Sequence, residues 1–280
     1  MLLIAIGIAL LVAGAVAYGA LRWRAETRTL RARLEAGRAP RPGVAFNPTE
    51  LDSLPAPVRR YLLATLRPGQ PFVAAVDLEQ TGTMNMSEAA EQWLPFHASQ
   101  HVTTHRPGFD WDARIAMLPG MPVHVHDAYI EEEGLLHAAV LGLVSVASVR
   151  GKGDIAKGEL LRFLAEAPWY PTILLPGQKV QWDAVDGTSA RATITDGETA
   201  VSVLFRFNDE GMIESFTAAA RGRINGGKTT FAPWQGRFWD YATRDGMRIP
   251  LQGEVAWVLP TGTKPYWRGR VTRVSYEFER

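Results

Sequence analysis

The feature that most constrains this chain is an uninterrupted apolar segment at its start. Residues 2–21 contain no charged side chain and no proline. At the helical rise of roughly 1.5 Å per residue, such a segment spans about 30 Å, which is the thickness of the hydrocarbon core of a bilayer. A secretory signal would open with a basic region, and none precedes Leu2. We therefore predict a retained transmembrane anchor over residues 1–22.

Arginine is concentrated directly behind this segment. Residues 22–41 hold seven arginines and two glutamates, whereas residues 42–280 hold 23 basic and 27 acidic side chains. A mildly acidic domain lacks the basic surface of a nucleic-acid binder, so no nucleic-acid partner is expected. The positive-inside rule predicts a single-pass protein of the bacterial inner membrane whose domain faces the cytoplasm, with membrane lipid as a partner.

Proline and glycine mark the end of this basic segment. The stretch 37–43 (GRAPRPG) cannot continue a helix and is typical of a linker. We therefore divide the chain into the anchor at 1–22, a basic juxtamembrane helix and linker at 23–46, and a single β-rich domain at 47–280.

The remainder of the chain carries the pattern of an antiparallel meander. Asp-Gly and Asn-Gly dipeptides, which favour tight hairpins, recur at 186–187, 196–197, 225–226 and 245–246. We predict a mainly β (α+β) fold in which the anchor precedes a large curved sheet or half-barrel of about 11–12 strands. The expected strands are 72–86, 92–105, 109–117, 121–130, 135–149, 179–185, 189–195, 199–207, 212–220, 233–241, 247–258 and 266–278.

One helix interrupts the predicted strands. Asp154 is a good N-cap, the residues behind it are mostly apolar, and Pro168 ends the helix, so we expect it over 154–167. An apolar helix followed by an aromatic tail is suited to cover one face of the sheet and to leave a pocket beside it. We select as pocket-lining residues Trp111, Phe163, Trp169 and Tyr170, although core packing is an alternative role for each.

Five stretches resemble a bacterial, membrane-anchored family known only as a domain of unknown function. They are 54–61 (LPAPVRRY), 93–96 (WLPF), 108–114 (GFDWDAR), 159–176 (ELLRFLAEAPWYPTILLP) and 265–269 (PYWRG). The resemblance covers residues 50–275 and implies no activity. The order of helix, long meander and inserted helix is also similar to LolA-like lipoprotein carriers. That likeness implies an apolar ligand in the concave face and an extracytoplasmic domain, against the arginine placement.

Histidine and carboxylate side chains are the only metal ligands to consider, because the chain has no cysteine. On a strand, His124 and His126 would share one face about 7 Å apart, and His137 could approach from the next strand. The alternative is a set of half-exposed strand histidines. His97, His101 and His105 are spaced too widely on a strand to share a metal. We expect neither a metal nor a cofactor.

A second candidate cluster depends on the register of one hairpin. If Pro119 and Gly120 form its turn, Asp112 faces Asp127 and Arg114 lies close to both. A carboxylate pair beside an arginine could act as acid and base, or simply form a structural ion network. No nucleophile elbow or phosphate loop accompanies the cluster.

The predicted function is therefore a membrane-anchored, non-enzymatic module that binds an apolar or lipid-like ligand near the membrane surface. One alternative is an enzyme that uses the Asp/Arg cluster, with or without a histidine-bound metal. The other is a scaffold that docks another membrane protein.

Overall fold

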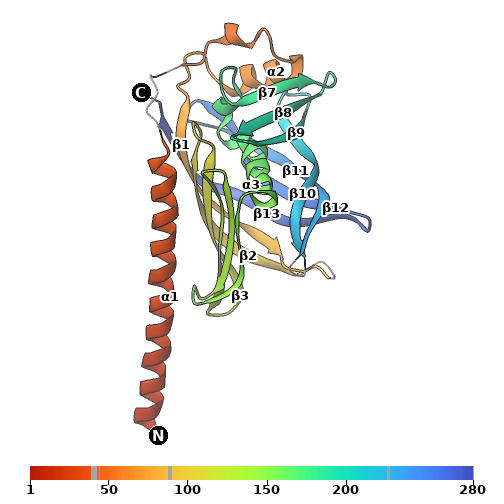
Figure 1. Cartoon of the computed structure of the whole chain (residues 1–280). Coiled ribbons are helices and arrows are strands. Elements are labelled where there is room, and N and C mark those ends of the chain that lie inside the picture. Colours follow the sequence, from red (N-terminus) through yellow and green to blue (C-terminus); the bar gives the residue numbers. More distant parts are fainter. Residues whose placement is uncertain (39–42, 44, 88–89, 226–227, 280) are drawn as a thin grey trace.

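A computed structural model describes residues 1–38, 43, 45–87, 90–225 and 228–279. A long N-terminal helix, α1 (Leu2–Ala36), runs along one side of a β-rich body and projects beyond it (Figure 1). A short 3-10 turn, η1 (Pro48–Leu51), and helix α2 (Ala56–Thr65) lead into the sheet. Most of the predicted linker at 37–43 lies outside the described residues.

The body is a single antiparallel sheet of thirteen strands. Its first six strands are β1 (Val73–Asn85), β2 (Trp93–Thr103), β3 (Gly108–Leu118), β4 (Met121–Ile130), β5 (Glu133–Val140) and β6 (Val144–Gly151). The other seven are β7 (Val180–Ala184), β8 (Ser189–Asp196), β9 (Thr199–Phe207), β10 (Ile213–Asn225), β11 (Lys228–Arg244), β12 (Met247–Leu259) and β13 (Gly262–Phe278). The predicted α+β fold with a large antiparallel half-barrel is confirmed.

The extra strand comes from a turn that the sequence did not reveal. We predicted one strand over 135–149, but the chain turns at Leu141 and Gly142, which have φ values of 54° and 68°. Leucine rarely adopts a positive φ, and the single glycine at 142 is a weak turn signal among apolar residues, so the sequence predicts an unbroken strand here. The segment therefore forms two strands, β5 and β6.

The order of the strands explains why a helix lies inside the sheet. Strands β1–β6 form one half and β7–β13 the other, and the halves meet where β1 pairs with β13. Strands β6 and β7 are then the two opposite edges, so the chain must cross the concave face to pass from one to the other. It does so as α3 (Asp154–Ala165), η2 (Ala167–Trp169) and η3 (Pro171–Leu174). The covering helix predicted at 154–167 thus ends two residues earlier and continues as 3-10 turns.

The sheet is covered on both faces where β2, β3 and β4 lie. Helix α3 contacts β3 and β4 from the concave side, and α1 contacts β2, β3 and β4 from the convex side (Figure 1). Both faces are therefore shielded, and β4 is buried almost along its length. The main core, which includes Leu160, Leu164 and Phe205, lies between the concave face and the crossing segment.

Candidate functional site

A small hollow remains between the concave face and the crossing segment. It has a volume of about 80 Å³ and opens to the surface. Aromatic side chains from both halves of the sheet and from η2 form most of its wall: Trp111, Trp169, Phe216, Trp234, Phe238, Tyr266 and Trp267. Such a wall favours apolar or aromatic groups.

The structure places the four predicted pocket residues in two different environments. Trp111 and Trp169 line the hollow. Phe163 and Tyr170 are fully buried beside each other, and the Tyr170 hydroxyl donates to the Phe163 carbonyl at 2.6 Å. The turn of the helix explains the difference, because Arg162 and Glu166, four residues apart, occupy the side of α3 that faces the hollow.

Charged side chains form the polar part of the wall. The Arg162 guanidinium pairs with Asp127 and with Glu166, and it lies 5.1 Å from the centre of the Trp111 ring. Glu166 also accepts a hydrogen bond of 2.6 Å from Gln100. Because Arg162 is almost fully enclosed, these partners offset the cost of removing its charge from water.

A second ion pair lies deeper. Arg221 donates to Glu159 at 3.1 Å and lies 4.6 Å from the centre of the Trp234 ring. Burial and the nearby Asp127 carboxylate raise the pKa of Glu159 to about 8, against the attraction of Arg221. Each of the two guanidinium groups is thus paired with at least one carboxyl group of the cluster.

The Tyr266 hydroxyl is a polar group of the wall that still has a hydrogen to donate. It accepts hydrogen bonds from Trp234 Nε1 at 3.0 Å and from Arg221 Nη1 at 3.2 Å. A hydroxyl has two acceptor lone pairs and one donor hydrogen, so both lone pairs are used. Burial raises the pKa of Tyr266, which keeps that hydrogen in place.

The predicted Asp/Arg cluster is not assembled. A bulge between Ala116 and Leu118 shifts the pairing of β3 with β4 by one residue, so Asp112 faces His126 and Trp111 faces Asp127. A shift by one residue moves every side chain of a strand to the other face. Asp127 therefore points into the hollow, whereas Asp112 lies on the convex face under α1. Arg114, opposite His124, is exposed.

The three candidate metal histidines do come together, but around an indole ring. The centres of the His124, His126 and His137 rings lie 5.2, 4.5 and 5.2 Å from the centre of Trp23, and His126 is stacked on it. Trp23 is buried against the sheet, and its Nε1 donates to Asp112 at 2.8 Å. The described residues contain no group of three side chains placed to hold a metal.

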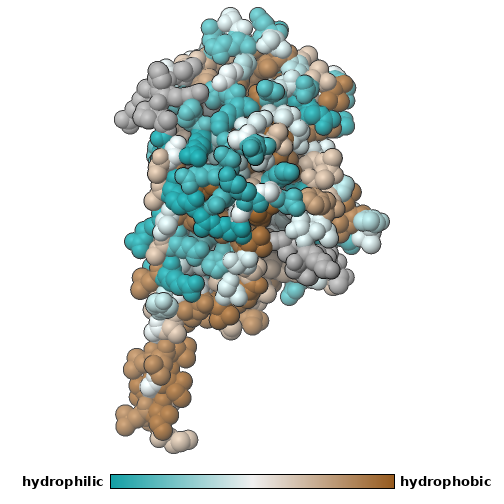
Figure 2. Space-filling model, in the orientation of Figure 1, coloured by the Kyte–Doolittle hydropathy of each residue, from teal (hydrophilic) through white to brown (hydrophobic). Residues whose placement is uncertain are grey.

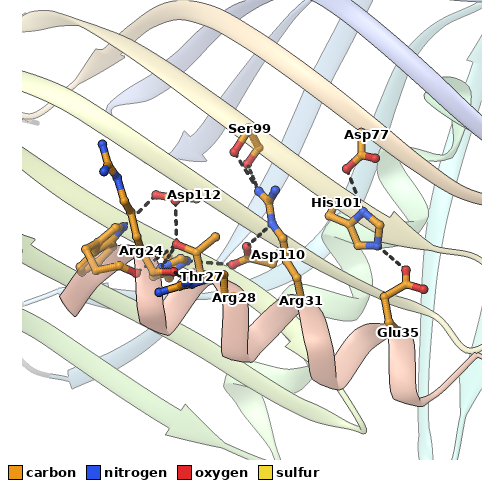
Figure 3. A network of polar contacts seen from close by, with 12 residues as sticks. Arg24, Thr27, Arg28, Arg31, Glu35, Asp77, Ser99, His101, Asp110 and Asp112 are labelled. Atoms are coloured by element: carbon orange, nitrogen blue, oxygen red, sulfur yellow. Dashed lines mark hydrogen bonds and ion pairs between the residues drawn. The ribbon is translucent and has the colours of Figure 1, made fainter. Parts of the chain in front are cut away.

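Trp23 opens a line of polar contacts between α1 and the sheet, drawn in Figure 3. One turn further along, the Thr27 hydroxyl lies 2.9 Å from Asp112 and 3.2 Å from His126 Nε2. His126 Nδ1 lies 2.8 Å from Asp110, and both side chains are fully buried. Asp110 also pairs with Arg31 at 3.1 Å. These contacts fix the position and the rotation of the helix on the sheet.

His101 binds the C-terminal end of α1 to the sheet. Its Nδ1 lies 2.8 Å from Asp77 and its Nε2 lies 2.7 Å from Glu35 (Figure 3). Burial lowers the pKa of His101, but the hydrogen bonds and charges of Asp77 and Glu35 outweigh that effect, so the pKa is raised. Protonated His101 donates to a carboxylate on each side, one from the sheet and one from the helix.

Sequence reasoning missed Arg162, Glu166, Arg221 and Tyr266. Part of the signal was present, since Glu159, Arg162 and Glu166 recur along an otherwise apolar helix, where charges need buried partners. Nothing in the sequence marked Arg221 or Tyr266, because their partners come from distant strands.

A comparison with protein-family models assigns the chain to a family. The sequence model of a family described as "Family of unknown function (DUF6920)" matches residues 52–276. The chain belongs to this family. The predicted resemblance to a family of unknown function is thereby confirmed, and DUF6920 carries no activity with it. A comparison with curated proteins found no match.

Solved structures similar to this DUF6920 protein are half-barrels. A LolA superfamily protein from Nitrosomonas europaea is 11% identical, with a TM-score of 0.38 over 74% of this chain and 86% of that one. A putative outer membrane lipoprotein-sorting protein domain from Vibrio parahaemolyticus is 8% identical, with a TM-score of 0.38 over 73% and 86%. A β-barrel-like DUF1849 protein from Brucella abortus is 11% identical, with a TM-score of 0.25 over 74% and 98%. At such identities the likeness concerns the fold alone.

Proposed function

We propose that this protein is a membrane-anchored, non-enzymatic module that binds an apolar, lipid-like molecule in the hollow between the sheet and α3. The observation that carries the proposal is the open hollow itself, with its wall of aromatic rings from β3, β10, β11, β13 and η2. At about 80 Å³ it has room for a ring or a short piece of chain. The rest of the ligand would lie at its open mouth.

The polar part of the wall defines the class of ligand. The charged side chains around Arg162 and Arg221 are already paired with one another, which favours a molecule without net charge. The spare hydrogen of Tyr266 suits one acceptor oxygen, such as a carbonyl or an ether. We therefore propose a neutral apolar ligand that carries one such oxygen.

The anchor is supported by the apolar part of α1. Its most apolar window has a mean hydropathy of 2.4, and the helix is long enough to cross a membrane. Residues 1–18 are all exposed. Arg22, Arg24 and Arg28 follow on the exposed side of α1, an arrangement that favours the cytoplasmic side for the domain.

Filling the hollow tests the proposal. The probes are decanone, decanoate and decylammonium, added to the full-length protein in nanodiscs while the fluorescence of the four wall tryptophans is followed. We expect decanone to bind most tightly and Val255→Trp, which fills the hollow, to abolish that binding. Val258→Trp lies on the same strand outside the hollow and serves as the control. Equal binding by wild type and Val255→Trp would place the probe elsewhere and end the proposal.

A further inference from the structure

Two uncharged hairpin turns of the β-rich body lie beside the point where α1 leaves it, one between β3 and β4 and one between β5 and β6. Leu118 and Met121 flank the first turn, and Val144 and Val146 follow the second. All four side chains are exposed, Leu118 and Val144 by more than 60%. We call these four side chains the apolar rim.

The rim is continuous with the apolar surface of α1. At Gly19 the helix crosses the second turn so closely that an added Cβ would lie 2.3 Å from the Leu141 carbonyl oxygen and 2.7 Å from Leu143. Residues 1–18 then project freely. Figure 2 shows hydrophobic residues gathered at this foot of the body and along the emerging helix.

The sequence around the two hairpin turns is free of charge. Residues 115–123 and 138–149 contain no charged side chain. Other turns of the sheet carry acids, such as Glu131 and Glu132 between β4 and β5 or Asp186 between β7 and β8. In a meander, alternate turns lie at opposite ends, so these two uncharged turns share the anchor's end with the β1–β2 turn, which carries Glu91, and the β4–β5 turn lies at the other end.

Basic side chains lie just behind the rim. Arg114 is exposed on β3 opposite His124, and His124 contacts Trp23, so Arg114 is level with Trp23 near the start of the helix–sheet contact. Arg22 and Arg24 flank Trp23 on α1 and are also exposed. An apolar edge followed by a band of arginine matches the order of hydrocarbon and anionic head groups in a bilayer.

We propose that the apolar rim is a second membrane contact, which inserts into the outermost hydrocarbon of a bilayer beside the anchor. Exposed apolar area of this kind marks an interaction surface. The occupant is a lipid surface because the rim continues the apolar side of α1 and has arginine behind it. The polar contacts of α1 with β2, β3 and β4 hold the rim at a fixed height relative to the anchor. This inference rests on the membrane anchoring proposed above and is independent of the ligand.

Single cysteines test the rim cleanly because the chain has none of its own. The variants Leu118→Cys and Val144→Cys carry an environment-sensitive fluorophore in full-length protein, reconstituted into vesicles of phosphatidylglycerol and phosphatidylcholine. The quenchers are lipids with a spin label either near the head group or near the chain end. Val12→Cys reports on the anchor, and Val185→Cys, on the remote β7–β8 hairpin, is the aqueous control (Figure 1).

The expected result is quenching of positions 118 and 144 by the shallow label, of position 12 by the deep label, and of position 185 by neither. If position 12 is quenched but positions 118 and 144, like position 185, are not, the proposal for the rim is overturned and the anchor stands. A position 12 without quenching would remove the anchor and the rim together. If the fluorophores at positions 118 and 144 were shielded from water in native membranes but not in the vesicles, the surface would bind a protein partner, and the proposal would also be overturned.

Discussion

At the scale of single residues, the buried charges beside the hollow govern how the protein responds to pH. Glu159 is enclosed, one of its carboxyl oxygens has no partner in the described part of the chain, and its pKa is raised to about 8. Between the unfolded pKa of about 4.3 and the folded value, the native state binds more protons than the unfolded state. This group therefore makes the protein most stable below that window and less stable as pH rises through it.

Glu159→Gln should remove that dependence. The amide copies the protonated carboxyl, so the free energy of unfolding should change little at pH 5 and should fall less than in wild type between pH 5 and pH 8. Denaturant unfolding of the detergent-solubilised protein at several pH values measures this. Glu198→Gln, at an exposed position, is the matched control. A wild-type-like pH profile in Glu159→Gln would show that this carboxyl ionises normally.

Tyr266→Phe tests the spare hydroxyl hydrogen. One neutral hydrogen bond contributes about 0.5–1.5 kcal/mol, so decanone should bind roughly two- to tenfold more weakly. Decane, which has no oxygen, should be unaffected by the substitution. Tyr18→Phe, on the exposed part of α1, controls for the loss of a tyrosine. Equal weakening of decanone and decane would point to a packing change instead of a lost donor.

At the scale of elements, the contact between α1 and the sheet is held by polar side chains more than by apolar packing. The apolar contacts are few, with Leu30 and Leu34 against Ala128 and Ile130. Trp23, Thr27, Arg31 and Glu35 are spaced at four-residue intervals, so they form one face of the helix. Each of the four meets a polar group of the sheet, which makes the contact sensitive to protonation.

Docking of α1 should weaken as pH rises through the raised pKa of His101. The pKa of His101 is raised in the docked state, so protonated His101 favours docking of α1. This contribution is complete at pH values below the ordinary pKa near 6.5 and is lost as the pH rises above the raised pKa. Hydrogen exchange of the amides of residues 24–36, corrected for intrinsic rates, should therefore show less protection at pH 9 than at pH 6. His101→Gln should flatten the difference, whereas His97→Gln, at an exposed position of the same strand, should leave it unchanged. Equal protection at both pH values in wild type would exclude this role.

The elements also show how far sequence reasoning reached. Turn dipeptides and alternation located twelve strand segments and the crossing helix, because those signals are local. The bulge at Ala116–Leu118 and the turn at Leu141 carry no strong local signal, and the first alone separated Asp112 from Asp127. The partners of Arg221 and His101 depend on which strands become neighbours, and no local pattern contains that information.

At the scale of the whole molecule, the arginines behind the apolar part of α1 favour one side of the membrane for the domain. We predict the cytoplasmic side. Val185→Cys in intact cells should not react with a membrane-impermeant maleimide until the cells are permeabilised. A cysteine at the exposed position of Met1, followed by a short tag, should instead react with the maleimide in intact cells, before permeabilisation. Labelling of position 185 in intact cells would place the domain outside.

The pairing of β1 with β13 has a consequence for synthesis. Val73 and Phe278, which begin that pairing, are separated by nearly the whole domain, so the contact forms only after the ribosome has made every other strand. Contacts between residues so distant in sequence slow folding. During that interval the two half-sheets have unpaired edges, and the proposed anchor would hold them beside the bilayer. We expect such a nascent chain to depend on its anchor, or on chaperones, to keep neighbouring copies apart until β13 pairs with β1.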